Sequence, residues 1–208
     1  MNTAVGRLEF CGGIGSGKST VARLLAAHYA LPFVEEHYQE VPFWKEFYQD
    51  PESFNFEKNI SFLLFHSNAV RAVTSSNRRR LPVCDFALFQ DLAYAAMSGK
   101  SADYLATVAV HARLAERLGP PALIIRVTCP IETQLERIAM RGREPERAIT
   151  AHYLEDLDEA ITSELAIHHA DVPLIEVDTA SLDFTHDPSA GLDYLAGRLA
   201  PWIGARHS

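Results

Sequence analysis

Apolar residues occur along this chain in two alternating patterns: short continuous runs, and longer segments in which apolar positions recur every three or four residues. The clearest run covers residues 122–128, where Ile124, Ile125 and Val127 form the β-branched stretch that is typical of a strand buried on both faces of a parallel sheet. Other short apolar runs share this character. We therefore expect five strands, at residues 7–11, 31–36, 81–85, 122–128 and 172–178.

The segments between these runs have the spacing of helices. In residues 53–75 the apolar positions lie close to a helical repeat, which predicts one long helix. Residues 37–51 are rich in aromatic side chains and contain Pro42 and Pro51, so we expect irregular structure that closes over a pocket. The other helices are expected at residues 21–29, 88–97, 102–118, 131–141, 149–169 and 192–203. Strands that alternate with helices predict a doubly wound parallel α/β fold.

The composition is that of one globular domain, which we expect to span residues 1–208, with 48% hydrophobic and 22% charged residues. No apolar run approaches the length that crosses a bilayer, and the first residues do not resemble a secretory signal, so no membrane contact is expected. Cys11, Cys84 and Cys129 lie far apart in or beside expected strands. We interpret them as reduced core thiols in a cytoplasmic protein.

The net charge of −8 argues against a nucleic-acid-binding surface, because such surfaces neutralise phosphates with Lys and Arg. Basic residues instead gather in two short segments. Arg78 to Arg80 follow the long helix and are interpreted as a solvated basic turn, with phosphate contact as the alternative. The second segment, residues 137–147, carries several arginines and is considered below.

A glycine-rich stretch joins the first expected strand to the first helix. Residues 12–19 have the form G-x-x-x-x-G-K-[ST], which allows backbone N–H groups and a helix start to converge on a phosphate. Lys18 is expected to neutralise the β- and γ-phosphates of ATP, and the Ser19 hydroxyl to hold Mg²⁺. The alternative, a plain glycine-rich turn, does not account for this combination of residues. The expected nucleotide-binding residues are Gly12, Gly13, Ile14, Gly15, Ser16, Gly17, Lys18, Ser19 and Thr20.

Two acids follow expected strands. In open parallel sheets the ligand lies beyond the carboxyl ends of the strands, so Glu36 after the second strand is a candidate general base. The alternative for Glu36 is a solvated loop acid. Asp85, at the end of the third strand, is expected to bear on Mg²⁺, as acids at this place in P-loop proteins do.

Three arginines are expected to lie together near the end of the helix at residues 131–141. Arg137 and Arg141 are four residues apart and therefore share one side of that helix, and Arg143 follows shortly after it. Guanidinium groups this close repel one another unless an anion lies between them, and a triphosphate supplies that anion. The alternative is a solvated segment in which the arginines pair with nearby acids, namely Glu136, Glu144 and Glu146.

Taken together from about residue 8 to residue 184, these motifs resemble those of the deoxynucleoside kinase family. Residues 12–20 match the family's P-loop, G-x-I-G-x-G-K-S-T, and residues 137–143 are similar to its R-x-x-x-R-G-R lid. The resemblance implies a P-loop nucleoside-kinase fold with a lid at about residues 141–150. It further implies transfer of the γ-phosphate of ATP, with Mg²⁺, to the 5′-hydroxyl of a deoxynucleoside, and a homodimer.

The resemblance also implies roles for residues on the acceptor side. The family's catalytic Glu at the end of the second strand matches Glu36. Residues 47–51 are similar to the segment F-Y-x-D-P, so that Tyr48 would contact the 3′-hydroxyl of the sugar, which Glu146 would also reach. Asp91 matches an acid that helps to read the base.

On the donor side, the resemblance implies that Asp183 and Phe184 border the adenine of ATP. It also implies a set of cationic side chains that stabilise the transferred phosphoryl group. These are Lys18, Arg137, Arg141 and Arg143.

Two positions depart from the family pattern. The base-reading Gln of the long helix is Asn59 here, one methylene and about 1.5 Å shorter, which leaves the nucleobase open. The Arg that follows the acid of the third strand, and that pairs with the catalytic carboxylate, is Phe86. The alternatives are therefore a kinase of nucleoside monophosphates or another small alcohol, and a nucleotide-binding module with little kinase activity.

Overall fold

The computed structural model describes residues 6–76 and 80–203. Arg78 and Arg79 of the expected basic turn lie outside these residues, whereas Arg80 donates a hydrogen bond to the carbonyl oxygen of Ala30 at 2.8 Å. The described elements are β1 (Leu8–Cys11), α1 (Lys18–His28), β2 (Phe33–Val34), η1 (Tyr38–Glu40), α2 (Trp44–Gln49), α3 (Pro51–Ser76), β3 (Val83–Cys84), α4 (Gln90–Ala96), α5 (Ala102–Leu118), β4 (Leu123–Thr128), α6 (Ile131–Arg141), η2 (Glu144–Ala148), α7 (Ala151–His168), β5 (Leu174–Asp178) and α8 (Pro188–Ile203).

The five strands form one parallel sheet in the order β2-β3-β1-β4-β5. The order places β1 at the centre, with connections that run outward on both sides of it. This arrangement confirms the doubly wound parallel α/β fold. All five carboxyl ends lie at one edge of the sheet, and the glycine-rich loop after β1 therefore stands in the middle of that edge.

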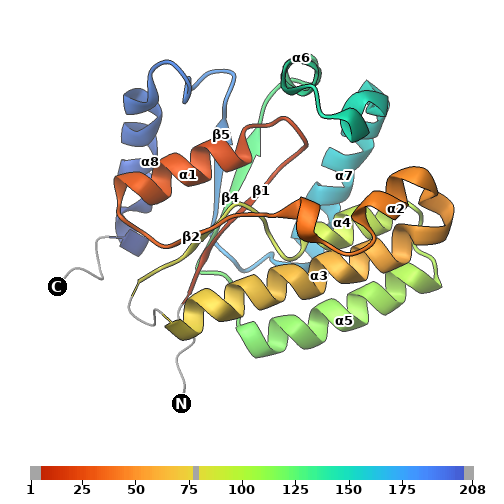
Figure 1. Cartoon of the computed structure of the whole chain (residues 1–208). Helices are drawn as coiled ribbons and strands as arrows, with labels where there is room; N and C mark the ends of the chain where they lie inside the picture. The colour runs from red at the N-terminus through yellow and green to blue at the C-terminus, as the bar shows by residue number, and fades with distance from the viewer. Residues whose placement is uncertain (1–5, 77–79, 204–208) are drawn as a thin grey trace.

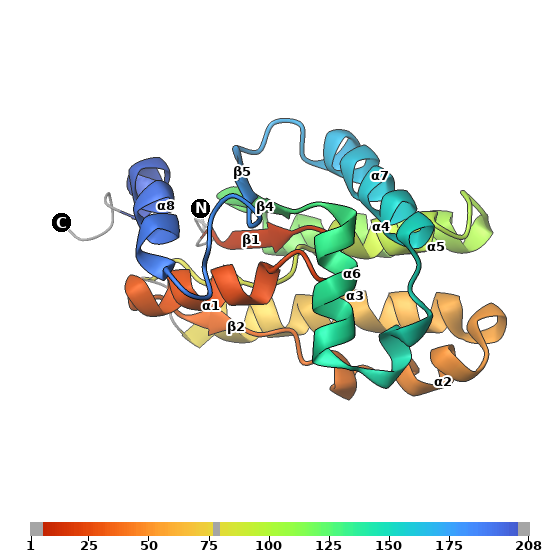
Figure 2. The same cartoon turned by 90° about the horizontal axis from the view of Figure 1, so that it is seen from above.

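Two layers of helices cover the sheet (Figures 1 and 2). Leu8 and Phe10 of β1 are fully buried in a cluster with α1 and α8, whereas Cys11 is buried on the opposite face with α4 and α7. Successive residues of a strand point to opposite faces, so the apolar run of β1 serves both layers. The long helix α3 packs beside β2 and β3 on the same side as α4, with α5 outside it (Figure 1).

The element boundaries depart from expectation most at residues 37–51 and at the start of the first helix; in addition, α8 begins at Pro188 rather than at residue 192, and β2 and β3 are shorter than expected. Residues 37–51 were expected to be irregular, but they form η1 and the short helix α2, because their aromatic side chains pack against α3, as in the stacked pair Phe43 and Phe54. The first helix begins at Lys18 rather than at residue 21, since the left-handed conformation of Gly17 (φ 100°) ends the loop there. Its first turn therefore includes Lys18, Ser19 and Thr20.

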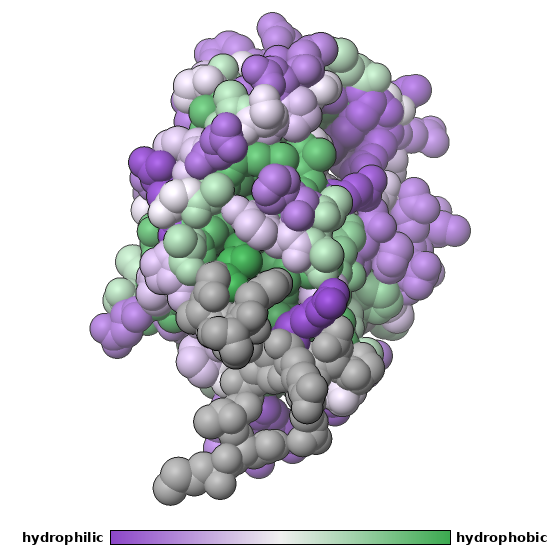
Figure 3. Space-filling view, turned by 90° about the vertical axis from the view of Figure 1, so that its left-hand side faces the viewer, coloured by the Kyte–Doolittle hydropathy of each residue, from purple (hydrophilic) through white to green (hydrophobic). Residues whose placement is uncertain are grey.

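The described surface and the three cysteines are those of an ordinary globular domain. No helix within residues 6–76 and 80–203 is long and apolar enough to cross a membrane. The side of the molecule that carries α8 shows polar residues around a small central group of apolar ones (Figure 3). Cys11 and Cys84 are buried free thiols in the sheet, and Cys129 is a half-buried one after β4.

Candidate active site

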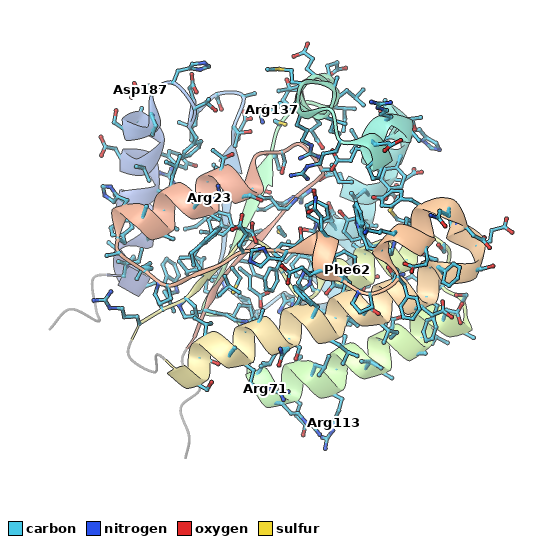
Figure 4. All side chains as sticks on the ribbon, in the orientation of Figure 1. Arg23, Phe62, Arg71, Arg113, Arg137 and Asp187 are labelled. Atoms are coloured by element: carbon cyan, nitrogen blue, oxygen red, sulfur yellow. The ribbon has the colours of Figure 1, made fainter. Side chains whose placement is uncertain are left out.

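A cleft of about 920 Å³ opens at the carboxyl edge of the sheet. Its walls come from the glycine-rich loop, α2, α3, α4, α6 and the loop before α8. Arg137 on α6 and Phe62 on α3, both labelled in Figure 4, line the cleft on opposite sides. All the expected site residues line this cleft except four that lie directly behind its wall, namely Gly12, Gly13, Ser16 and Asp85.

The glycine-rich loop has the backbone that its sequence predicts. Gly12 and Gly15 adopt positive φ values of 140° and 81°, and a Cβ at Gly12 would overlap the carbonyl oxygen of Val127. The Gln90 side chain fixes the loop, since its Oε1 accepts from the Gly12 N–H at 3.0 Å and its Nε2 donates to the Gly12 carbonyl at 3.3 Å. The loop is therefore a preformed phosphate cradle in front of the α1 N-terminus.

Lys18 lies inside this cradle. Its Nζ donates hydrogen bonds to the carbonyl oxygens of Gly12 at 2.7 Å and Gly13 at 3.1 Å. Burial lowers the pKa of the Lys18 ammonium, and the carboxylates of Glu36 and Asp85 offset part of that effect. A buried cation that faces the loop is well placed to meet the negative charge of a phosphate chain.

Arg137 connects α6 to two loops at the sheet edge. Its Nη1 donates to Thr179 Oγ1 at 2.8 Å and lies 3.3 Å from the carbonyl oxygens of Gly15 and Ser16, while its Nη2 donates to the Thr179 carbonyl at 3.0 Å. The sequence predicted a phosphate contact only. The structure adds a structural contact, because the same guanidinium ties the loop after β1 to the loop after β5.

The lid arginines are paired with one acid. Glu146 lies within η2, and its carboxylate accepts from Arg141 Nε at 2.6 Å and from Arg143 Nη1 at 3.3 Å. The Arg143 guanidinium also lies over the Tyr38 ring, 4.8 Å from its centroid. The alternative in which the arginines pair with a nearby acid is thus present in the structure. Arg141, Arg143 and Glu146 all line the cleft, however, where a polyphosphate would compete with Glu146 for the two guanidinium groups.

Asp85 connects the expected metal position to the expected base. Its Oδ1 accepts a hydrogen bond from the Glu36 backbone N–H at 2.7 Å, and the Ser19 hydroxyl lies within hydrogen-bonding reach of the same carboxyl. Burial and the charge of Glu36 raise the pKa of Asp85 to about 6. One hydroxyl and one carboxylate beside a phosphate cradle fit Mg²⁺, which takes few protein oxygens and completes its shell with phosphate and water.

Glu36 has a partner that the sequence did not indicate. His66 of α3 is buried, and its Nε2 lies 3.2 Å from Glu36 Oε1 while its Nδ1 lies 2.9 Å from Asp91 Oδ2. Phe86 stacks on the other side, with the two ring centroids 4.0 Å apart and the planes at 11°. Glu36, the expected general base, is therefore connected through the His66 imidazole to Asp91, the acid expected to read the nucleobase.

The rest of the acceptor wall combines buried polar side chains on α3 with the more exposed Tyr48 of α2. Asn59 is 3% exposed and lines the cleft, next to Lys58, whose Nζ lies 3.7 Å from the Phe47 ring centroid. Burial lowers the pKa of Lys58 to about 8, against the opposing effect of Asp91. Tyr48 lines the same wall, and burial is the main cause that raises its pKa to about 12.

The two residues expected near adenine differ in environment. The Asp183 carboxylate accepts hydrogen bonds from the backbone N–H groups of Thr185 and His186 at 2.8 and 2.9 Å, and these contacts hold its pKa at about 2. Phe184 is 5% exposed and packs in the core with α8, so only part of its ring lines the cleft. Asp183 thus shapes the loop, and Phe184 anchors it.

Sequence reasoning missed His66 and Lys58. His66 lies seven residues after Asn59, two helical turns on, and that spacing placed it on the same side of the long helix, which was a usable signal. Lys58 had no such signal, because a lysine on a helix is usually solvated, whereas here its ammonium lies near the rings of Phe47 on α2 and Tyr94 on α4.

The central phosphate cradle, the doubly wound sheet and the cleft define the class of P-loop kinases that act on small molecules. The family model for deoxynucleoside kinases matches residues 10–193. The chain therefore belongs to the deoxynucleoside kinase family, and it is an enzyme that phosphorylates a nucleoside with ATP as the donor. This confirms the resemblance found in the sequence.

Individual relatives agree with this placement. The chain is 27% identical over 195 residues to a deoxyguanosine kinase of Bacillus subtilis, covering 91% of this chain and 93% of that protein. It is 28% identical over 175 residues to a deoxyadenosine kinase of Dictyostelium discoideum, covering 82% and 71% of the two chains. Among solved structures, a deoxyadenosine kinase of M. mycoides with bound dCTP superposes with a TM-score of 0.77 at 20% identity over 94% of this chain and 99% of that one.

Proposed function

We propose that this kinase transfers the γ-phosphoryl group of ATP to the 5′-hydroxyl of a purine deoxynucleoside, with Glu36 as the general base. The observation that carries the proposal is the position of Glu36. It is linked through Asp85 to Ser19 of the phosphate cradle on one side, and it faces the cleft lined by Asn59 and Tyr48 on the other. A hydroxyl held at Glu36 would therefore meet the end of a phosphate chain held at the loop.

The donor side positions the phosphates. The backbone N–H groups of residues 12–20 and the Lys18 ammonium hold the β- and γ-phosphates, and the adenine lies near Asp183 and Phe184. Arg137 keeps the cradle in place and, with Arg141 and Arg143, stabilises charge on the transferring group. Mg²⁺, held by Ser19 and Asp85, would neutralise the phosphate oxygens when bound.

The acceptor side positions the nucleoside. Glu36 accepts the proton of the 5′-hydroxyl as that oxygen bonds to the γ-phosphorus and ADP leaves. Tyr48 and Glu146 lie where the 3′-hydroxyl of the sugar is expected, and Asn59 and Asp91 where the base is expected. The shorter Asn59 leaves room for a larger base, and the deoxyguanosine and deoxyadenosine kinases among the relatives support a purine.

The assembly, the domain and the setting are proposed from the surface, the core and the thiols. The exposed Leu64 of α3 and Leu105 of α5, on two neighbouring helices, support a homodimer through this side of the molecule. The shared core of the described residues supports a single domain over residues 1–208, with the lid at about 141–150. The free thiols support a cytoplasmic setting. Sedimentation of the wild type and of Leu105→Asp tests the homodimer. A charge at this exposed leucine should dissociate the two protomers.

Replacement of the expected base tests the function. Glu36→Gln keeps the shape of the side chain and removes its basicity, so we expect kcat for phosphorylation of deoxyguanosine and deoxyadenosine to fall by about 10²- to 10⁴-fold. ATP affinity should stay near the wild-type value, because Glu36 faces the acceptor. Glu35→Gln, at the neighbouring exposed acid, is the matched control. Wild-type turnover by Glu36→Gln would refute the base assignment, and turnover of nucleoside monophosphates alone would refute the acceptor.

A further inference from the structure

The acceptor wall contains a buried cation where the family's arginine is missing. Phe86 stands at the position of that arginine and carries no charge, but His66 approaches Glu36 from the opposite element, α3. The His66 side chain is 2% exposed: its Nδ1 forms a hydrogen bond with Asp91, and the Phe86 ring stacks on it. Its Nε2, which has no hydrogen-bond partner among the described residues, lies at the ion-pair distance of 3.2 Å from the Glu36 carboxylate. A side chain enclosed in this way has one orientation available to it.

The charges around His66 favour its protonated form. Burial alone would lower the pKa of the imidazole, but the adjacent carboxylates of Asp91 and Glu36 outweigh it and raise that pKa to about 10. Reciprocally, His66 is the main influence that holds the pKa of the Glu36 carboxyl below its usual range against the opposing effect of burial. Other charged groups that act on these three residues are Lys18 of α1, Arg143 of the lid, Asp85 after β3, Lys58 of α3 and Glu9 of β1.

Phe86 has a positive role in this arrangement. Its ring lies nearly parallel to the imidazole at a centroid distance of 4.0 Å and is itself buried, which fixes the plane in which the two ring nitrogens point. An arginine at position 86 would place a second guanidinium-sized cation against His66, where the flat apolar ring now stands. Phe86 and His66 are thus matched to each other.

We propose that His66 is the positioning residue of the phosphoryl-transfer site: its ring, oriented by Asp91 and Phe86, contacts Glu36 and keeps this carboxylate directed at the acceptor hydroxyl. The proposal rests on the role of Glu36 as the base. It gives Asp91 a function in orienting His66 in addition to any contact with the nucleobase. It also explains why the loss of the arginine at position 86 is compatible with an active kinase.

The separation of kcat from KM distinguishes this role from a purely structural one. In His66→Gln the Glu36 carboxylate loses the ring that holds it in place, so the loss should appear in kcat while the KM for the nucleoside changes little. At pH 7.5 we expect kcat to fall by about 10- to 100-fold, with the KM for ATP unchanged. His111→Gln, at a buried histidine of α5 that does not line the cleft, is the matched control and should behave as wild type.

Combined variants separate this inference from the proposed function. If His66 acts through Glu36, the double variant His66→Gln/Glu36→Gln should be no slower than Glu36→Gln alone. Full activity of Glu36→Gln would refute the base assignment itself. An inactive Glu36→Gln together with wild-type kcat in His66→Gln, and a change only in the KM for the nucleoside, would overturn the present inference and leave the function intact. Phe86→Arg should not raise kcat, and an increase would also overturn it.

A spectroscopic measurement does not depend on the folding of the His66 variant. In the wild type, the ¹⁵N chemical shifts of the ring nitrogens should show a histidine that stays protonated at pH 8. In Glu36→Gln the titration midpoint of that signal should fall, because one of its two carboxylate partners is gone. Nine neutral histidines at pH 8 in the wild type would overturn the proposal.

Discussion

The two walls of the cleft present different groups to a ligand, backbone on the donor side and side chains on the acceptor side. The donor wall is mostly backbone: a loop with positive φ at Gly12, Gly15 and Gly17, fixed by hydrogen bonds from Gln90 and Arg137 to its main-chain atoms. The acceptor wall is mostly side chain, with buried charged and aromatic groups that α3, α4 and the segment after β2 bring together.

The difference follows from what each wall recognises. A phosphate chain is the same in every nucleoside triphosphate, so a single local segment of backbone N–H groups can bind it. A nucleoside differs in base and sugar, so its wall needs side chains whose mutual contacts set the shape and the charge. We therefore expect changes in the donor wall to abolish transfer for all acceptors, and changes in the acceptor wall to affect acceptors unequally.

Among the predictions that follow, loss of the donor cation should have the largest effect. Lys18→Ala removes the ammonium that faces the phosphate cradle, and we expect kcat to fall by about 10³-fold with every nucleoside, since charge on the transferring group is no longer stabilised. A coupled assay for ADP with deoxyguanosine and deoxyadenosine measures it. Lys100→Ala, at an exposed lysine before α5, is the control. A loss confined to one nucleoside would contradict the division between the two walls.

Asp85 lies between the walls, and its replacement should separate activity from stability. Burial and Glu36 raise its pKa to about 6, so the folded protein holds this proton more tightly than the unfolded chain does. Stability is therefore lost as the pH rises from about 4 through 6, the range between the unfolded and folded values. Asp85→Asn cannot ionise, and its side-chain oxygen still accepts from the Glu36 N–H.

We expect Asp85→Asn to be more stable than the wild type at pH 7.5 by up to about 3 kcal/mol, with the difference absent at pH 4. Its kcat should fall by about 10²-fold, because one oxygen ligand of the expected metal site loses its charge. Thermal unfolding at the two pH values and the ADP assay measure these effects. Equal free energies of unfolding of the two proteins at pH 7.5 would contradict this prediction, because they would show that ionisation of Asp85 does not destabilise the fold.

The contrast between the walls also explains what the sequence could predict. The sheet and the phosphate cradle follow from contiguous residues, since the apolar runs and the spacing of Gly12 to Ser19 act locally. The pair of Glu36 and His66 joins positions 30 residues apart, and its formation depends on how α3 packs beside β2. Burial of Lys58 likewise requires α2, a helix that the proline-interrupted sequence of residues 37–51 did not suggest.

Lengthening the amide of the acceptor wall should change preference more than rate. Asn59→Gln extends the buried side chain by one methylene toward the base, and we expect the ratio of kcat/KM for purine over pyrimidine deoxynucleosides to fall by about tenfold. The KM for ATP should stay the same. Asn55→Gln, one helical turn earlier at a half-buried position that does not line the cleft, is the control. An equal decrease for all bases would mean that Asn59 supports the fold rather than reading the base.

The smallest effect is expected for the sugar contact, and it can be measured against a change in the substrate. Tyr48→Phe removes one hydroxyl from the acceptor wall. The loss of a single neutral hydrogen bond to the 3′-hydroxyl should lower kcat/KM for a 2′-deoxynucleoside by about fivefold. For a 2′,3′-dideoxynucleoside, which lacks the partner oxygen, the same variant should match the wild type. Tyr38→Phe, at a second tyrosine of the cleft, is the control, because its ring and not its hydroxyl meets Arg143. If Tyr48→Phe lowered kcat/KM equally for both substrates, the hydroxyl would stabilise the protein rather than bind the sugar. Selectivity of the acceptor wall would then depend less on direct contact with the substrate than phosphate binding by the donor wall does.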